Sequence, residues 1–94
     1  MNVAVTKIDL FGNSLQGAAQ RPFKVRVWVM RDGVERRYDV TVRPHILGGT
    51  NSLLQADEQF QDDFSYEQYS MHHILRLVSD ALGGKPVPLP MHVE

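Results

Sequence analysis

The 94-residue sequence contains no cysteine, and it has no long apolar run. The lack of cysteine excludes disulfide bonds, thiolate nucleophiles and thiolate zinc sites, and it is typical of a reducing compartment. A membrane-spanning helix requires about 18 consecutive apolar residues. The first residues, Met-Asn-Val-Ala-Val, lack the basic and apolar regions of a signal peptide. We therefore expect a soluble, cytoplasmic protein.

The sequence also lacks motifs for catalysis or for cofactor binding. Gly12 and Gly17 are not followed by the Lys-Ser or Lys-Thr pair of a phosphate-binding loop. The Ser, His and Asp residues show neither the nucleophile elbow nor the spacing of a catalytic triad. His72 and His73 are adjacent, so on a helix they project about 100° apart and cannot chelate one ion. We expect no enzymatic activity, no catalytic residue, no metal and no other cofactor.

What the sequence does contain is typical of one small globular domain spanning residues 1–94. Hydrophobic residues make up 43% and charged residues 22%, which is too apolar for a disordered chain. The charge is unevenly spread. Residues 1–50 hold eight Lys or Arg against four Asp or Glu, whereas residues 51–94 hold two against seven. This distribution indicates a basic pole and an acidic pole, or two ordinary solvated faces.

A β-hairpin over residues 23–42 is the clearest local signal. Phe23–Met30 alternates between apolar and polar residues, Arg36–Val42 nearly does, and Asp32-Gly33 between them favours a two-residue type I′ turn. That turn pairs residues whose numbers sum to 65. The resulting register sets Phe23 opposite Val42, Val25 opposite Val40 and Val27 opposite Tyr38 on one face, with Arg26 opposite Asp39, Trp28 opposite Arg37 and Met30 opposite Glu35 on the other.

The remaining segments complete an α+β pattern. Val3–Phe11 reads as a strand whose alternation changes phase, which predicts a β-bulge near Thr6 and Lys7. We predict that Pro44 ends the third strand, because proline cannot donate to the ladder. Ser52–Phe60 has the pattern of a short helix.

A long helix is predicted over residues 66–82. Ser65 and Gln68 form a capping box, and Phe64 and Tyr69 occupy the positions of a hydrophobic staple. The helix should end at Gly83. Its apolar stripe comprises Met71, Ile74, Leu75, Val78 and Leu82, widened by Leu77 and Ala81.

The predicted architecture is therefore a three-stranded antiparallel sheet, made of the hairpin 23–42 and the N-terminal strand, packed against the helix 66–82. The helix covers the face of Val25, Val27, Tyr38 and Val40. Residues 85–94 form an extended tail rich in proline, which docks on its own chain, on a twin or in a partner's groove. Two open sheet edges make a homodimer an expectation as well.

The outer face of the hairpin is the candidate binding surface. Its members, all from the polar side of the two strands, are Lys24, Arg26, Trp28, Met30 and Arg37. Trp, Arg and Met are enriched at protein interfaces, and an aromatic ring flanked by cations is also used to stack single-stranded nucleic acid. A third interpretation is that the tail or another strand covers Trp28. The acidic residues on the same face speak against a phosphate-binding surface.

The sequence thus favours a small non-enzymatic protein that binds another protein, as a regulator, adaptor or inhibitor that occludes its partner's surface. In general profile it is similar to small phage-encoded inhibitors, although no family motif is present. The alternative is a nucleic-acid-binding module that uses the basic hairpin face. An enzyme or an enzyme subunit is the third class.

Overall fold

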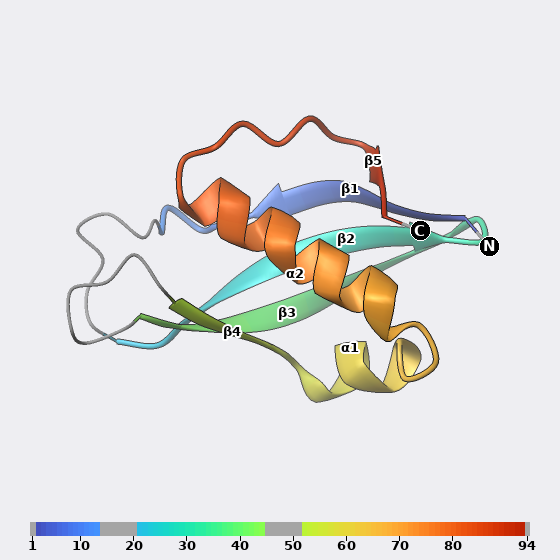
Figure 1. The fold of residues 1–94 in the computed structure, drawn as a ribbon, viewed down its shortest axis with the longest axis horizontal. Helices are drawn as coiled ribbons and strands as arrows, with labels where there is room; N and C mark the ends of the chain where they lie inside the picture. The colour runs from blue at the N-terminus through green and yellow to red at the C-terminus, as the bar shows by residue number, and fades with distance from the viewer. Residues whose placement is uncertain (1, 14–20, 45–51, 94) are drawn as a thin grey trace.

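The computed structural model describes residues 2–13, 21–44 and 52–93, and it shows an α+β fold with one curled antiparallel sheet. Within these residues the sheet has five strands in the order β4-β3-β2-β1-β5 (Figure 1). In chain order the elements are β1 (Val3–Asp9), β2 (Phe23–Arg31), β3 (Val34–Pro44), β4 (Ser52–Ala56), α1 (Glu58–Asp63), α2 (Gln68–Leu82) and β5 (Met91–His92).

The predicted hairpin is confirmed in turn type and in register. Asp32 and Gly33 have φ angles of 50° and 84°, so both lie in the left-handed region that a type I′ turn requires. Strands β2 and β3 pair from Phe23 opposite Val42 to Arg31 opposite Val34. The register of this hairpin is set by its two-residue turn and by the alternation of apolar residues in the two strands. Both lie within a short stretch of the sequence, so the register could be predicted without knowledge of distant contacts.

The bulge predicted in the first strand is also confirmed. The pairing of β1 with β2 shifts register between Val5 and Lys7, so Val5 lies opposite Val29 and Lys7 lies opposite Trp28. The extra residue, Thr6, restores the phase of the strand. The apolar residues on either side of it can then face the same core.

The prediction of three strands is wrong, because the described residues form five. The short helix predicted over Ser52–Phe60 is instead strand β4 followed by α1. β4 pairs with residues 40–44 of β3, and the hydrogen bonds of that ladder override the helical tendency of the Leu-Leu-Gln-Ala sequence. Helix α1 begins after Asp57, whose side chain accepts a hydrogen bond of 2.8 Å from the backbone N–H of Phe60.

The predicted helix is shorter than expected, since it begins at Gln68 rather than at Tyr66. Its end and its buried face are confirmed, but its predicted capping is wrong. Helix α2 ends at Gly83 and has 15 residues, with Glu67 at its N-cap and no side-chain capping bond. Ser65 is exposed and Tyr69 is 78% exposed, so neither the capping box nor the staple forms. Phe64 is fully buried instead, against the rings of Tyr38 and Phe60.

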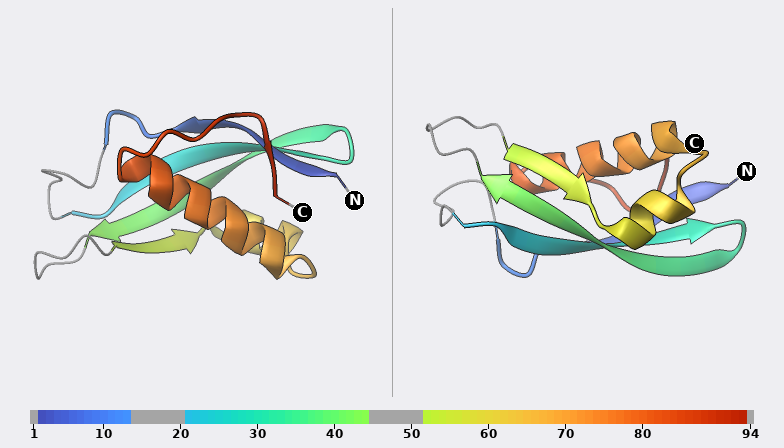
Figure 2. Two further views of the ribbon diagram at one scale, coloured as in Figure 1. Left: turned by 45° about the horizontal axis from the view of Figure 1, so that its top comes forward. Right: turned by 90° about the horizontal axis from the view of Figure 1, so that it is seen from below.

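The core lies between the sheet and the two helices, which cover one of its faces (Figure 2). The four hairpin residues predicted to face the helix, Val25, Val27, Tyr38 and Val40, are all at most 4% exposed. From α2, the core takes Ile74, Leu77, Val78 and Leu82.

The tail docks on its own chain rather than standing free. Its residues Met91 and His92 form β5, which pairs with Val5 and Ala4 of β1. Val93 is fully buried, and its backbone N–H donates to the carbonyl of Val3. One edge of the sheet is therefore partly covered by the end of the described chain.

Candidate functional site: the outer face of the sheet

The outer face of the sheet, opposite the helices, carries all five residues selected from the sequence. Lys24, Arg26, Trp28 and Met30 come from β2, and Arg37 comes from β3. Lys24 and Arg37 are exposed and the other three are half-buried. Within the described ranges, neither helix lies over this face (Figure 2). The fold therefore gathers these side chains on one open surface, which we call the outer face.

Trp28 is the centre of the outer face, and a cation from a third strand lies on it. The ammonium group of Lys7 is 4.6 Å from the centroid of the indole ring. Arg37 is directly opposite Trp28 on β3, as the register predicted. The register predicted from the sequence placed Arg37 beside Trp28, but sequence reasoning missed Lys7. Finding Lys7 requires both the bulge and the pairing of β1 with β2.

Arg26 is held by an anion and an aromatic ring. Its Nε donates a hydrogen bond of 2.9 Å to Oδ1 of Asp39, and this bond, with the carboxylate charge, raises the pKa of the Arg26 guanidinium. On its other side, the guanidinium carbon is 5.7 Å from the ring centroid of Phe11. Phe11 is 53% exposed and was not selected from the sequence, where it is only the last residue of a predicted strand.

The conformation of Phe11 is unusual for an aromatic residue. Its φ of 52° lies in the left-handed region, which residues other than glycine rarely adopt. Its backbone N–H donates a hydrogen bond of 2.9 Å to Oδ1 of Asp9, which stabilises the turn after β1. This turn therefore sets an exposed aromatic side chain beside Arg26 at one end of the outer face.

The charges of the outer face are mixed. The cations are Lys7, Lys24, Arg26 and Arg37, and the anions are Asp9, Glu35 and Asp39. Glu35 accepts a hydrogen bond of 2.8 Å from the hydroxyl of Thr6. No carboxylate of the described residues forms an ion pair with Arg37, whose exposed guanidinium is available to a partner.

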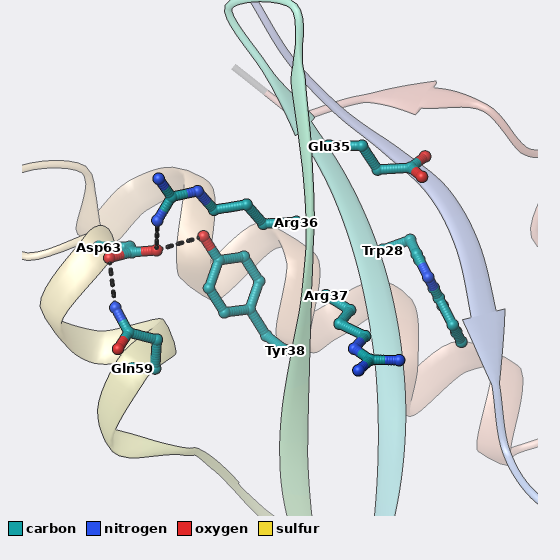
Figure 3. A pocket seen from close by; sticks show the side chains of 7 residues that line it. All are labelled: Trp28, Glu35, Arg36, Arg37, Tyr38, Gln59 and Asp63. Carbon is teal, nitrogen blue, oxygen red and sulfur yellow. Dashed lines mark hydrogen bonds and ion pairs between the residues drawn. The ribbon is translucent and has the colours of Figure 1, made fainter.

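A cleft of about 400 Å³ adjoins the outer face at the edge of β3 (Figure 3). Its lining is drawn from both sides of the strand: Trp28, Glu35, Arg36, Arg37, Tyr38, Gln59 and Asp63. Trp28 and Arg37 thus border the cleft as well as the outer face. In Figure 3 they lie on one side of the β3 ribbon, with Asp63 on the other.

The polar floor of this cleft is a hydrogen-bonded network around Asp63. Its Oδ2 accepts bonds from the Tyr38 hydroxyl at 2.6 Å and from Arg36 at 3.3 Å, and its Oδ1 accepts from Gln59 at 2.7 Å. The Tyr38 hydrogen bond lowers the pKa of the Asp63 carboxyl. Burial and the same bond raise the pKa of Tyr38 to about 12. Both shifts favour the state in which the Tyr38 hydroxyl is protonated and the Asp63 carboxylate is ionised, which is the state that forms this hydrogen bond.

Two of the described histidines, His72 and His73, are adjacent on α2 and differ in their surroundings. His72 is exposed, and His73 is half-buried with its ring 6.5 Å from that of Tyr69. His45 lies outside the described residues. Among the residues that are described, no three His, Asp or Glu side chains are grouped to hold a metal ion. None of the described helices is long and apolar enough to cross a membrane.

Comparisons with protein-family models, with curated protein sequences and with solved structures found no match to this chain. Its function is therefore inferred from its own residues.

Proposed function

We propose that this chain is a small non-enzymatic regulator, adaptor or inhibitor that binds another protein through the outer face and occludes the surface it covers. The central contacts are Arg26, Trp28, Met30 and Arg37, with Lys24 at the margin. Lys7 and Phe11, which the fold adds to the outer face, extend the contact area. A cytoplasmic location belongs to this proposal, and a sequence without cysteine is typical of a reducing compartment.

One observation carries the proposal: Trp28, which alternates on β2 with the buried Val27 and Val29, lies on the sheet face that no described helix covers. The part of the Trp28 ring that stays exposed on this face is apolar surface that a partner could cover, and Trp and Arg are the residues that most often dominate the binding energy of interfaces. The Arg37 guanidinium beside the ring can form a bidentate pair with a partner's carboxylate. The interspersed acids supply charge complementarity of the other sign.

Binding of single-stranded nucleic acid is the second candidate, and Lys7 over the Trp28 ring is the observation that favours it. A base could stack at such a site while the neighbouring cations track phosphates. Two features weigh against it. Arg26 is already paired with Asp39, and the three anions on the same face would repel a phosphate backbone.

The test is site-directed photo-crosslinking in the cells that produce the protein. A photoreactive amino acid replaces Lys24 at the margin of the outer face or, as a matched control, Arg76 on the exposed side of α2. We expect a protein adduct from position 24 and none from position 76. The captured partner, once identified and purified, should bind Trp28→Ala about 30-fold more weakly than the unmodified chain, as expected of a hot spot.

Three results would contradict the proposal. The first is equal crosslinking from positions 24 and 76, and the second is unchanged binding of the Trp28→Ala variant to the purified partner. The third is tight binding of a single-stranded oligonucleotide that weakens steeply when salt is raised from about 50 to about 200 mM, which would establish the second candidate. Circular dichroism of each variant separates lost binding from lost folding.

The homodimer expected from the open sheet edges is a separate proposal. It concerns the edge of β3 rather than the outer face, and it can hold or fail independently of the function proposed here.

A further inference from the structure

The half of β3 nearest the hairpin turn has a partner on one side only. β2 pairs with β3 along residues 34–42, but β4 pairs only with residues 40–44. Figure 1 shows β3 extending past the end of β4 toward the turn. Within the described part of the chain, no strand pairs with this outer edge before Asp39, and the cleft of about 400 Å³ lies against it.

One hydrogen bond shows which backbone groups of β3 point away from β2 along this edge. The N–H of Asp57 donates to the carbonyl of Asp39 at 3.1 Å, so the backbone of Asp39 points away from β2. Because the direction of backbone groups alternates along a strand, the N–H and C=O groups of Glu35 and Arg37 point the same way. These four groups form a short, unused template for strand addition.

We infer that a second copy of this chain pairs with this edge, β3 against β3, across a two-fold axis at Arg36. A two-fold axis perpendicular to the sheet makes the two strands antiparallel. To use the outward groups, Glu35 and Arg37 must lie in hydrogen-bonded pairs. Centring the pair on Arg36 sets Glu35 opposite Arg37 of the second copy, and Arg37 opposite its Glu35, so opposite charges meet twice.

The neighbouring registers are excluded by charge. Centring on Arg37 would set two Arg37 side chains opposite each other and Glu35 opposite Asp39. Centring on Glu35 would oppose two glutamates. Like charges directly opposite across a ladder are destabilising. Among these three registers, only the one centred on Arg36 sets Glu35 opposite Arg37, and the like-charged pair that it contains, Arg36 opposite Arg36, has Asp63 as a counter-ion in each copy.

Two further features of the edge agree with this register. Val34 is 56% exposed, and pairing with the second copy would remove part of its apolar surface from water. The two Arg36 side chains would meet at the axis, but each guanidinium already has its own counter-ion, since it lies 3.3 Å from Asp63. The repulsion between the two Arg36 side chains is therefore partly neutralised within each copy.

The contact involves one short strand from each copy, so the buried area is below that of a permanent dimer. We therefore expect a weak dimer that dissociates on dilution. The outer faces of the two copies would continue into one another, which brings two Trp28 side chains onto one extended surface.

The experiment is a charge-swap analysis by sedimentation velocity over a range of protein concentrations. Glu35→Arg alone and Arg37→Glu alone should each weaken self-association about tenfold or more, because each opposes like charges twice. An equimolar mixture of the two variants should associate, because every pair across the axis then joins a cation of one variant to an anion of the other. The double variant Glu35→Arg/Arg37→Glu should also self-associate. Arg76→Glu on α2 is the matched control and should leave association unchanged.

The inference is wrong if the unmodified chain remains monomeric at millimolar concentration. It is also wrong if the Glu35→Arg variant self-associates as tightly as the unmodified chain. It is also wrong if the mixed variants and the double variant both fail to associate while circular dichroism shows them folded. Loss of association on Trp28→Ala with no effect of Glu35→Arg would place the dimer contact on the outer face instead, and would overturn the strand pairing.

Discussion

The hydroxyl of Tyr38 donates a hydrogen bond of 2.6 Å to the carboxylate of Asp63, which joins β3 to the end of α1. The ring of Tyr38 is also stacked on Phe60 of the same helix, with ring centroids 4.7 Å apart. A polar contact and an apolar contact between the same two elements thus fix α1 against β3.

Tyr38→Phe should lower the free energy of unfolding by about 1.5–3 kcal/mol, the range for a hydrogen bond to a charged group. The ring stacking survives in this variant, so the loss reports the hydrogen bond and the carboxylate it leaves behind. Urea denaturation followed by circular dichroism measures the change. Tyr69→Phe is the matched control, because Tyr69 is 78% exposed, and it should change stability by less than about 0.5 kcal/mol.

The same bond predicts a specific loss of stability at alkaline pH. The pKa of Tyr38 is raised from 10.0 to about 12 in the folded protein. The folded state therefore retains a proton that the unfolded state releases, and stability from this group is complete below pH 10 and is lost as the pH rises toward 12. Denaturation at several pH values in this window should show a loss in the unmodified chain that is smaller in Tyr38→Phe. Parallel curves for the two would contradict the prediction.

At acid pH the sign is reversed, because the Tyr38 hydrogen bond lowers the pKa of Asp63 below its ordinary value of 3.8. The contribution of Asp63 is present above that value and disappears as the pH falls through the folded-state pKa. Asp63→Asn should be less stable than the unmodified chain at neutral pH, with the gap narrowing on acidification. A gap that stays constant as the pH is lowered through this range would show that the Asp63 charge has no role.

The two helices should differ in their response to removal of polar residues near their first turns. Asp57→Ala should cost about 1 kcal/mol, since the Asp57 carboxylate caps the N–H of Phe60. Ser65→Ala should cost less than about 0.5 kcal/mol, because Ser65 is exposed and α2 begins after Glu67. Thermal denaturation of the two variants compares them directly. If Ser65→Ala costs more stability than Asp57→Ala, Ser65 caps a helix as the sequence predicted.

Trp28 and Val27 are adjacent on β2 and point to opposite faces, which makes them a matched pair. Trp28→Ala should change stability by no more than about 1 kcal/mol, because its ring lies on the open outer face. Val27→Ala should cost about 2 kcal/mol or more, since Val27 is fully buried and loses two methyl groups inside the core. If the tryptophan substitution is the more damaging one, Trp28 is a structural residue and the proposed contact surface loses its centre.

Much of the hairpin and its outer face could be predicted from the sequence because their determinants are local. The Asp32-Gly33 turn and the alternation beside it fix the register, which in turn places Lys24, Arg26, Trp28, Met30 and Arg37 together. Local rules also located the bulge at Thr6 and the end of α2 at Gly83.

The features that sequence reasoning missed depend on contacts distant in the chain. Residues 52–56 become a strand only because β3 offers them a ladder, and Lys7 reaches Trp28 only because β1 pairs with β2. Phe64 leaves its predicted staple for an aromatic cluster formed with Tyr38, 26 positions earlier. In each case a tertiary contact outweighed the local tendency of the segment.

The pairing of β5 with β1 has a consequence for synthesis on the ribosome. Val93 is buried beside the first strand, so the sheet cannot be completed until the last described residues have left the exit tunnel. Until then, the edge of β1 at Ala4 and Val5 is unpaired in the nascent chain. The interval during which this edge could join another chain is therefore set by the time needed to translate everything between β1 and β5, and slow translation of the later codons in that stretch would lengthen the exposure.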